Sequence, residues 1–287
     1  MKKTLSLILA GVLTAAMALS ASAAWADCDA EIKFGVKGIA ADVTWAADGE
    51  WTEGEYAEIA YKNCWISAAV ADEANLDAAK NLDVKLGLSW DAENLYTYIE
   101  FYDANGHDNL FGGDPGNMWQ ASAMQVSAAE VDSVAGDRLE YGVGLTSDTN
   151  EQISVVWADY LGSGYAVPTE DFIVINDGDT VTYEIRTPFS VFSTVAAKEG
   201  AQYGLNLLFA WGNGADYIHS QLSAGCSGDP GKAADRFADI TLEEAIVVET
   251  EPEVVEDVAA PQTFDAGIIA AVAAIVSAAG YAISKKR

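Results

Sequence analysis

Basic residues and histidines are scarce in this sequence. Its 287 residues include 15 lysines and arginines against 44 aspartates and glutamates, so the formal net charge is −29. A surface this acidic repels nucleic acid and anionic glycans, which disfavours both as partners and leaves neutral ligands, cations or a role in solubility alone. The two histidines, His107 and His219, are scattered rather than clustered as in a metal site. We therefore expect surface or core roles for them, rather than zinc or haem binding together with Met118 or Met124.

Enzyme signatures are also missing. The sequence has no G-x-S-x-G motif, no H-E-x-x-H motif and no glycine loop of the phosphate-binding kind. Carboxylate pairs such as Glu55 and Glu58 are so common in an acidic chain that no glycosidase pair stands out. We therefore expect a protein without catalytic activity.

Cysteine is rare as well. Cys28, Cys64 and Cys226 are the only three. In a secreted chain they allow one disulfide, with three possible pairings, and leave one free thiol. The sequence does not choose between these pairings.

Both ends of the chain carry targeting patterns. Residues 1–26 begin with two lysines after Met1, continue with "LSLILAGVLTAAMALSA" and end on "AWA", which predicts a secretory signal peptide cleaved after Ala26. The "ASA" just before it is an alternative cleavage signal. Residues 266–283 are uncharged and precede Lys285, Lys286 and Arg287, which predicts a C-terminal transmembrane helix within residues 264–287 with its basic end in the cytoplasm.

The stretch between the two ends divides into a linker and one domain. Residues 243–263 are rich in glutamate and contain two prolines, which predicts an acidic disordered linker. Residues 27–242 are enough for a single domain with a sizeable core.

Apolar and polar residues alternate in many short runs of this domain. Residues 82–90 and 95–102 flank the turn "DAEN" and predict a β-hairpin, and residues 171–189 predict another with Asp177-Gly178 at its turn. Short helices are expected only at residues 72–80 and just after Pro188. The pattern predicts an all-β fold, an antiparallel β-sandwich of the jelly-roll type. Further strand candidates are residues 138–145, 152–157, 202–211 and 237–242.

Several segments occur in an order that points to a known family. They include "ADGEWTEGEYAEI", "SWDAENLYTYIEFYD", "NMWQASAMQVS", "VTYEIRTPFSVF" and "GDPGKAADRFADITL". In this order, over residues 38–242, the chain resembles family 9 carbohydrate-binding modules, which are related to the broader DOMON-like sandwiches. The resemblance implies a β-sandwich that holds the end of a sugar chain between two tryptophan rings and contains calcium as a structural ion.

The resemblance assigns roles to individual residues. Trp119 matches the first tryptophan of the clamp, Gln125 stands where the family has a glutamate that hydrogen-bonds the sugar, and Asp103 matches a recurrent acidic position. Gly142 stands where an arginine would reach the sugar, and Ser227 stands where the second tryptophan would precede Asp-Pro. Half of the family's clamp is therefore absent from this chain.

The surroundings of Trp119 suit a sugar. Sugar recognition needs an apolar plate for the C–H face of the ring and nearby donors and acceptors for its hydroxyl groups. Trp119 supplies the plate, and Asn117, Gln120 and Gln125 lie close to it in the sequence. The alternative role for Trp119 is to fill a gap in the core.

Trp211 and Asn213 form a second candidate plate in "FAWGNGADY". Trp211 also continues an apolar alternation that begins at Tyr203, which favours a core role for its ring. The same core role is expected for Trp65, Trp90 and Trp157.

A calcium site is the metal candidate. The segment "DANGHDN" places Asp103, Asn105 and Asp108, whose oxygen atoms are of the kind that calcium prefers, in one loop. Its glycine spacing is not that of the twelve-residue calcium loop, and a solvated acidic turn is the alternative.

The C-terminal region resembles a sorting signal of Gram-positive surface proteins. Pro261, Gln262 and Thr263 precede the apolar run, and in such signals a sortase cleaves after the threonine and joins it to the cell wall. The usual leading leucine is absent, and Phe264 replaces the usual glycine. Simple retention in the membrane is the alternative, and both predict a protein anchored at the cell surface.

These observations leave three hypotheses. The first is a non-catalytic carbohydrate-binding domain displayed on the bacterial cell surface, engaging a polysaccharide or oligosaccharide. The second is a structural or adhesive surface domain without a sugar site. The third is a haem-binding domain of the DOMON type.

Overall fold

The computed structural model describes residues 23–26, 32–60, 65–69, 82–102, 109, 111, 114–134, 136–147, 149–213, 217–226 and 232–248. Within the strands, the side chains of residues 23–26, 65–69, 211–213 and 217–218 are not described. The described residues all fall in one structural unit, Met1–Val248, and the second unit, Glu249–Arg287, contains the remainder of the predicted linker and the predicted membrane segment.

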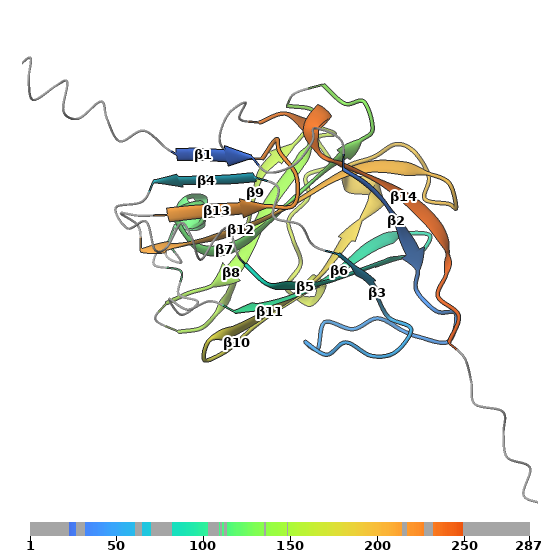
Figure 1. Ribbon diagram of the computed structural model, residues 1–287, viewed down its shortest axis with the longest axis horizontal. Coiled ribbons are helices and arrows are strands. Elements are labelled where there is room, and N and C mark those ends of the chain that lie inside the picture. The colour runs from blue at the N-terminus through green and yellow to red at the C-terminus, as the bar shows by residue number, and fades with distance from the viewer. Residues whose placement is uncertain are drawn as a thin grey trace, which may run out of the picture. The chain divides into compact units, whose positions relative to one another are not determined.

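β-Strands form nearly all of the regular structure in these residues, and the helical elements among them are short 3₁₀ turns (Figure 1). The all-β prediction is confirmed. The strands are β1 (Ala23–Ala26), β2 (Lys33–Gly38), β3 (Ala57–Ile59), β4 (Trp65–Ala69), β5 (Val84–Trp90), β6 (Asn94–Tyr102), β7 (Ala121–Glu130), β8 (Leu139–Leu145), β9 (Gln152–Asp159), β10 (Phe172–Asp177), β11 (Thr180–Pro188), β12 (Gln202–Asn213), β13 (Tyr217–Gln221) and β14 (Ala238–Ala245). The 3₁₀ turns are η2 (Pro115–Gln120), η3 (Thr169–Asp171), η4 (Phe189–Val191) and η5 (Ala234–Arg236).

Hydrogen bonds join the strands in the order β1-β4-β13-β12-β14-β2-β5-β6-β11-β10, while β7, β8 and β9 branch from β12, and β3 pairs with β5. The sheet folds over into two arms that β14 and β2 connect (Figure 1). We call β1, β4, β13, β12, β7, β8 and β9 the β7 arm, and β3, β5, β6, β11 and β10 the β6 arm. Residues of both arms pack into one hydrophobic core.

The predicted hairpins are present. β5 pairs with β6 and β10 pairs with β11, both antiparallel, as the alternation and the turn at Asp177-Gly178 predict. Gly178 has a positive φ of 68°, which explains why glycine occupies that turn position. The segment after Pro188 forms only the single 3₁₀ turn η4, and residues 72–80 lie outside the described residues.

One strand departs from the predicted antiparallel pattern. β2 pairs with β14 in parallel and also meets β5 in parallel at Gly38 and Trp90. The pairing with β2 carries β14 to Ala245, past the predicted strand end at residue 242. A parallel pair needs a long connection, and here nearly the whole domain separates the two strands, so local sequence patterns do not indicate it.

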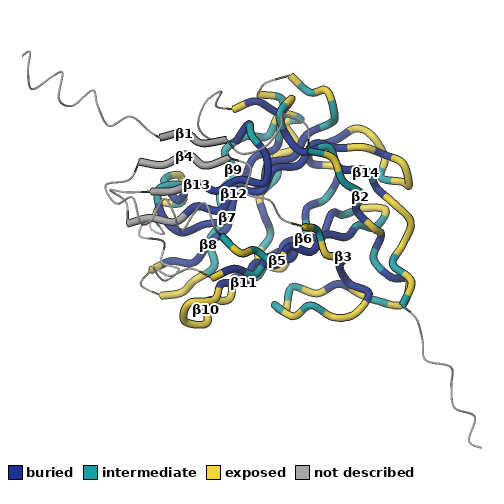
Figure 2. The backbone as a smooth tube through the Cα atoms, in the orientation of Figure 1, coloured by how far each residue is buried: buried dark blue, intermediate teal, exposed yellow. Residues whose placement is uncertain are grey.

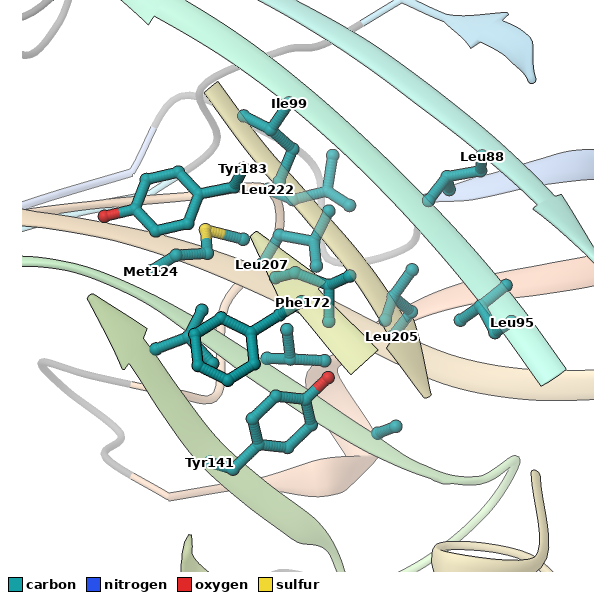
Figure 3. Packing of buried hydrophobic residues seen from close by; sticks show 14 of the residues in the cluster. Leu88, Leu95, Ile99, Met124, Tyr141, Phe172, Tyr183, Leu205, Leu207 and Leu222 are labelled. Atoms are coloured by element: carbon teal, nitrogen blue, oxygen red, sulfur yellow. The ribbon is translucent and has the colours of Figure 1, made fainter. Parts of the chain in front are cut away.

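The core lies between the arms (Figures 2 and 3). Successive side chains of a strand point to opposite faces, so the alternating residues of β12, Leu205, Leu207 and Phe209, are all buried in the core. Leu88 and Leu95 meet them from the β6 arm (Figure 3). The face of each arm that is turned away from this core is called its outer face below.

The predicted processing sites remain predictions. β1 lies within the predicted signal peptide and pairs with β4 through Ala26 and Trp65, so cleavage after Ala26 would remove β1 from the sheet. Among the described residues no helix is long and apolar enough to cross a membrane. Thr263 and residues 264–287 lie outside those residues.

Candidate functional site

Polar residues line the outer face of the β7 arm. On β7, Met124 and Val126 enter the core, so Gln125 and Ser127 point to the outer face. Ser127 stands directly opposite Asn206 of β12 in the register of the two strands. These polar residues are nevertheless buried, and Ser223 and Cys226 lie against them.

Strand register sets one row of side chains across this face. Gly142 of β8 stands opposite Gln125 of β7, Gln125 stands opposite Leu208 of β12, and Leu208 stands opposite Gln221 of β13. Residues that are directly opposite in antiparallel strands share a face. The position where the family resemblance expects an arginine, Gly142, is therefore the direct neighbour of Gln125.

The turn η2 contacts β7, β8, β9 and β12 and contributes its own side chains to this region. Asp114 caps the turn, since its carboxylate accepts hydrogen bonds from the backbone N–H of Gly116 at 3.2 Å and from Nδ2 of Asn117 at 2.8 Å. Asn109 donates from Nδ2 to the carbonyl oxygens of Met118 and Ser122 at 3.2 and 2.7 Å. The turn is thus held by hydrogen bonds at both of its ends.

Trp119 is half-buried on η2. Its ring and the ring of His219 pack edge to face, with centroids 6.1 Å apart, and Nε2 of His219 lies 2.7 Å from the carbonyl oxygen of Trp119. Burial lowers the pKa of His219 to about 4, so the imidazole is neutral at pH 7. Because a carbonyl only accepts hydrogen bonds, Nε2 carries the proton and donates it to Trp119.

Gln125 lies close to the thiol of Cys226 and is only 2% exposed. The Cys226 Sγ atom lies 3.7 Å from Oε1 of Gln125 and 3.2 Å from Oγ of Ser127, and the Cys226 backbone N–H donates to Oε1 of Gln221 at 3.2 Å. The amide oxygen of Gln125 is thus occupied by a neighbour from the chain itself.

The thiol of Cys226 is free and buried. Burial raises its pKa to about 11, so the group is uncharged at neutral pH. Cys28 and Cys64 lie outside the described residues, as does Ser227.

Trp157 contradicts the expectation of a core role. The core does not include it; its ring lies instead against Gly142 on the outer face, where a Cβ atom on Gly142 would lie 2.5 and 2.7 Å from two ring carbons of Trp157. Its Nε1 donates to the carbonyl oxygen of Gly116 at 3.1 Å. Trp90 does pack against the core as predicted, and the side chain of Trp65 is not described.

The other candidate residues are placed only in part. Trp211 and Asn213 are in β12, but their side chains are not described. Asp103, Asn105 and Asp108 lie outside the described residues, so the calcium site remains a prediction. Where side chains are described, no group of three or more histidine, cysteine or acidic side chains is placed to hold a metal ion.

Charged residues occupy the next row of the face. Glu140 of β8 stands opposite Ser127 and is 2% exposed. It accepts hydrogen bonds from Arg138, with Nε at 2.7 Å, and forms an ion pair with Lys232. The two cations neutralise this carboxylate, so this row does not add a bare negative charge beside Gln125.

A second cluster, on the outer face of the β6 arm, was not predicted from the sequence. Trp45, Tyr56, Tyr96 and Tyr98 pack together there with the half-buried Trp51. Glu184 accepts hydrogen bonds from Tyr56 Oη at 2.6 Å and from the backbone N–H groups of Asp48 and Gly49 at 2.8 and 2.7 Å. These contacts join residues more than 120 positions apart, so no local motif marks them. They fix the segment before β3 onto the sheet.

A surface pocket of about 560 Å³ lies elsewhere, between Glu93, Asn94, Ser190, Thr194 and Ala196. Its aromatic lining residue, Phe189, is only 4% exposed. The pocket therefore offers no aromatic plate to a sugar ring.

Comparison with known proteins places the fold. No family model matches the chain, and no curated protein matches it. A solved family 9 carbohydrate-binding module from Caldicellulosiruptor kristjanssonii in complex with glucose has a TM-score of 0.50 and 16% sequence identity, and the match covers 77% of this chain and 100% of that one. A family 9 module from the same organism in complex with cellotriose gives a TM-score of 0.49 with the same identity and coverage. The chain thus has an all-β fold similar to that of family 9 modules, as the resemblance implied.

Proposed function

We propose that this chain is a non-catalytic carbohydrate-binding domain whose sugar site lies at η2 on the outer face of the β7 arm. The observation that supports it is the indole of Trp119, half-buried on a turn that is hydrogen-bonded at both ends. The fold is similar to that of a module in complex with glucose. A partly exposed indole on a turn held in place suits stacking on the C–H face of a pyranose.

Amide groups supply the polar part of the proposed site. Asn117 and Gln120 are half-buried on the same turn as Trp119, and Nε2 of Gln120 donates to Oδ1 of Asn117 at 3.3 Å. Amides both donate and accept hydrogen bonds, which suits sugar hydroxyl groups. The net charge of −29 favours a neutral glycan over an anionic one.

Binding at this site is expected to be weak. Gln125, which the family resemblance places against the sugar, is buried beside Cys226. One stacked ring and a few hydrogen bonds, offset by lost solvation and lost ligand freedom, correspond to a Kd on the order of 1 mM. Display of many copies on a cell surface raises the effective affinity for a polymeric glycan.

In this proposal, the terminal segments hold the domain at the cell surface. A predicted signal peptide, an acidic linker and a predicted membrane segment fit a domain held outside the cell. Sortase attachment after Thr263 predicts that Thr263→Ala leaves the protein in the membrane fraction with an uncut tail. Equal release of wild type and variant by a wall hydrolase would leave only the simple membrane anchor.

A glycan array tests the binding function. The full chain in mild detergent is applied to neutral and anionic glycans, and we expect signals on neutral glycans only. Tyr160→Ala removes an aromatic residue that is 60% exposed just after β9. It serves as the control for Trp119→Ala and should bind as the wild type does. Absence of binding to every glycan would overturn the proposal.

A structural or adhesive domain without a sugar site is the second candidate function. The burial of Gln125 and His219 on the outer face favours it, because these polar groups contact the chain itself. An empty glycan array together with a normal unfolding transition would support this second function.

A further inference from the structure

We propose that Trp157 is a second aromatic plate of the carbohydrate site and that the site holds at least two units of a neutral pyranose chain. The inference rests on the proposed function and deepens it. It concerns a residue whose place in the sequence indicates a core role, and the structure supports it with three independent observations.

Trp157 points away from the core because Val156, its neighbour on β9, points into it, and a β-bulge at Trp157 interrupts the pairing of β9 with β8. In the pairing of β8 with β9, Tyr141 stands opposite Val156 and Glu140 stands opposite Ala158, so Trp157 has no partner residue. One extra residue in a strand re-aims the side chains around it, and such bulges are frequent beside binding sites. Val156 keeps its contact with the core, while the Trp157 ring reaches Gly142 on the outer face.

Gly142 makes room for this ring. A Cβ atom there would lie 2.5 and 2.7 Å from Trp157 ring carbons and 3.1 Å from the sulfur of Met118. Gly142 is not among the glycines with positive φ, so its backbone conformation does not require glycine. The missing side chain is explained instead by the close approach of the indole, at the position where the family resemblance expects an arginine.

The indole of Trp157 is held in one orientation. Its Nε1 donates to the carbonyl oxygen of Gly116, which belongs to the same turn η2 that carries Trp119. A ring that is already fixed loses little freedom when a ligand stacks on it. Trp157 is half-buried, so part of its surface remains accessible.

The two indoles contact different strands of the β7 arm, β13 and β8, which are separated in the sheet by β12 and β7. Trp119 contacts His219 of β13, whereas Trp157 contacts Gly116 and lies over β8. A single sugar ring stacks on one of them, and a chain of sugar rings that crosses η2 reaches both. We therefore expect the protein to bind a trisaccharide more tightly than the corresponding monosaccharide.

Titrations with cellotriose, xylotriose, mannotriose and maltotriose, each beside its monosaccharide, test this. Trp157→Ala should weaken trisaccharide binding about tenfold and bring it to the level of the monosaccharide. Trp157→Phe keeps a flat ring and should retain most of the binding. Trp51→Ala is the matched control, because Trp51 is also half-buried and its ring lies as close to Gly87 as that of Trp157 lies to Gly142. It should bind as the wild type does.

The NMR signals of the indole N–H groups distinguish the possible outcomes in the wild-type protein, where no substitution can disturb the fold. We expect the Trp119 and Trp157 signals, assigned with phenylalanine variants, to shift together as trisaccharide is added. A shift of Trp119 with no shift of Trp157, or unchanged trisaccharide binding by Trp157→Ala, would overturn the role of Trp157 and leave the proposed function intact. A wild type that binds none of the four trisaccharides and no glycan of the array would overturn both.

Discussion

Substitution of Gly142 by alanine gives a quantitative test of the packing between β8 and Trp157. The added methyl carbon would lie 2.5 Å from a ring carbon of Trp157, well inside van der Waals contact. The indole is also hydrogen-bonded to Gly116, so it cannot move aside without losing that bond. Overpacking of this kind costs about 1–3 kcal/mol of unfolding free energy. For a domain of this size the melting temperature should fall by roughly 2–12 °C.

Gly144→Ala is the matched control, two residues further along the same strand and on the same face. There the nearest atom to an added Cβ is the carbonyl oxygen of Ser122 at 3.5 Å, which is ordinary contact. Alanine restricts the unfolded chain more than glycine does, so this variant should be unchanged or more stable by up to about 1 kcal/mol.

Urea unfolding of both variants measures the difference in their unfolding free energies. The dependence of this free energy on urea concentration should be the same in both, which checks that the unfolding transition is the same. Equal stability of Gly142→Ala and Gly144→Ala would refute the close approach of Trp157 to Gly142. It would also remove one of the observations that support a binding role for Trp157.

Three further predictions concern other parts of the chain. Burial raises the pKa of Glu184 to about 7, above its ordinary value of 4.5. The contribution of this side chain to the unfolding free energy should therefore be full below pH 4.5 and be lost as the pH rises through 7. The unfolding free energy of the wild type relative to Glu184→Gln should fall over that range, and a difference that does not change with pH would contradict this. Cys226 is a free buried thiol, so we expect peptide mass spectra to show a disulfide between Cys28 and Cys64. Cys226 should react with an alkylating reagent only after unfolding, and a disulfide that contains Cys226 would contradict this. Deletion of residues 264–287 should release the protein into the medium, and retention on the cells would refute the predicted anchor.

Much of the fold was predictable because its signals are local. The hairpins β5–β6 and β10–β11 follow from apolar alternation and from turn residues such as Gly178. The pairing of β2 with β14 was not predictable in this way, because it joins strands from opposite ends of the domain and leaves no mark on either segment.

The site was predictable only in part for similar reasons. Trp119 could be selected from its polar neighbours in the sequence, and the structure leaves it half-buried on a turn. Trp157 was predicted to lie in the core, but Val156 takes the core position of β9 and leaves Trp157 on the outer face. Val155, Val156 and Trp157 are all apolar, so the sequence does not show which of them point inward. Gln125 is occupied by Cys226, about 100 residues away, which local patterns do not reveal.

The most direct test of the central claim is to measure glycan binding and stability together in Trp119→Ala. If the Trp119 ring is the sugar plate, binding should be lost, and the unfolding free energy should fall by less than about 1.5 kcal/mol, because the ring is half-buried with His219 at its side. If the ring mainly fills the fold, truncation should cost roughly 3–5 kcal/mol. A loss of that size, in a protein whose wild type binds no glycan, would contradict the proposed function.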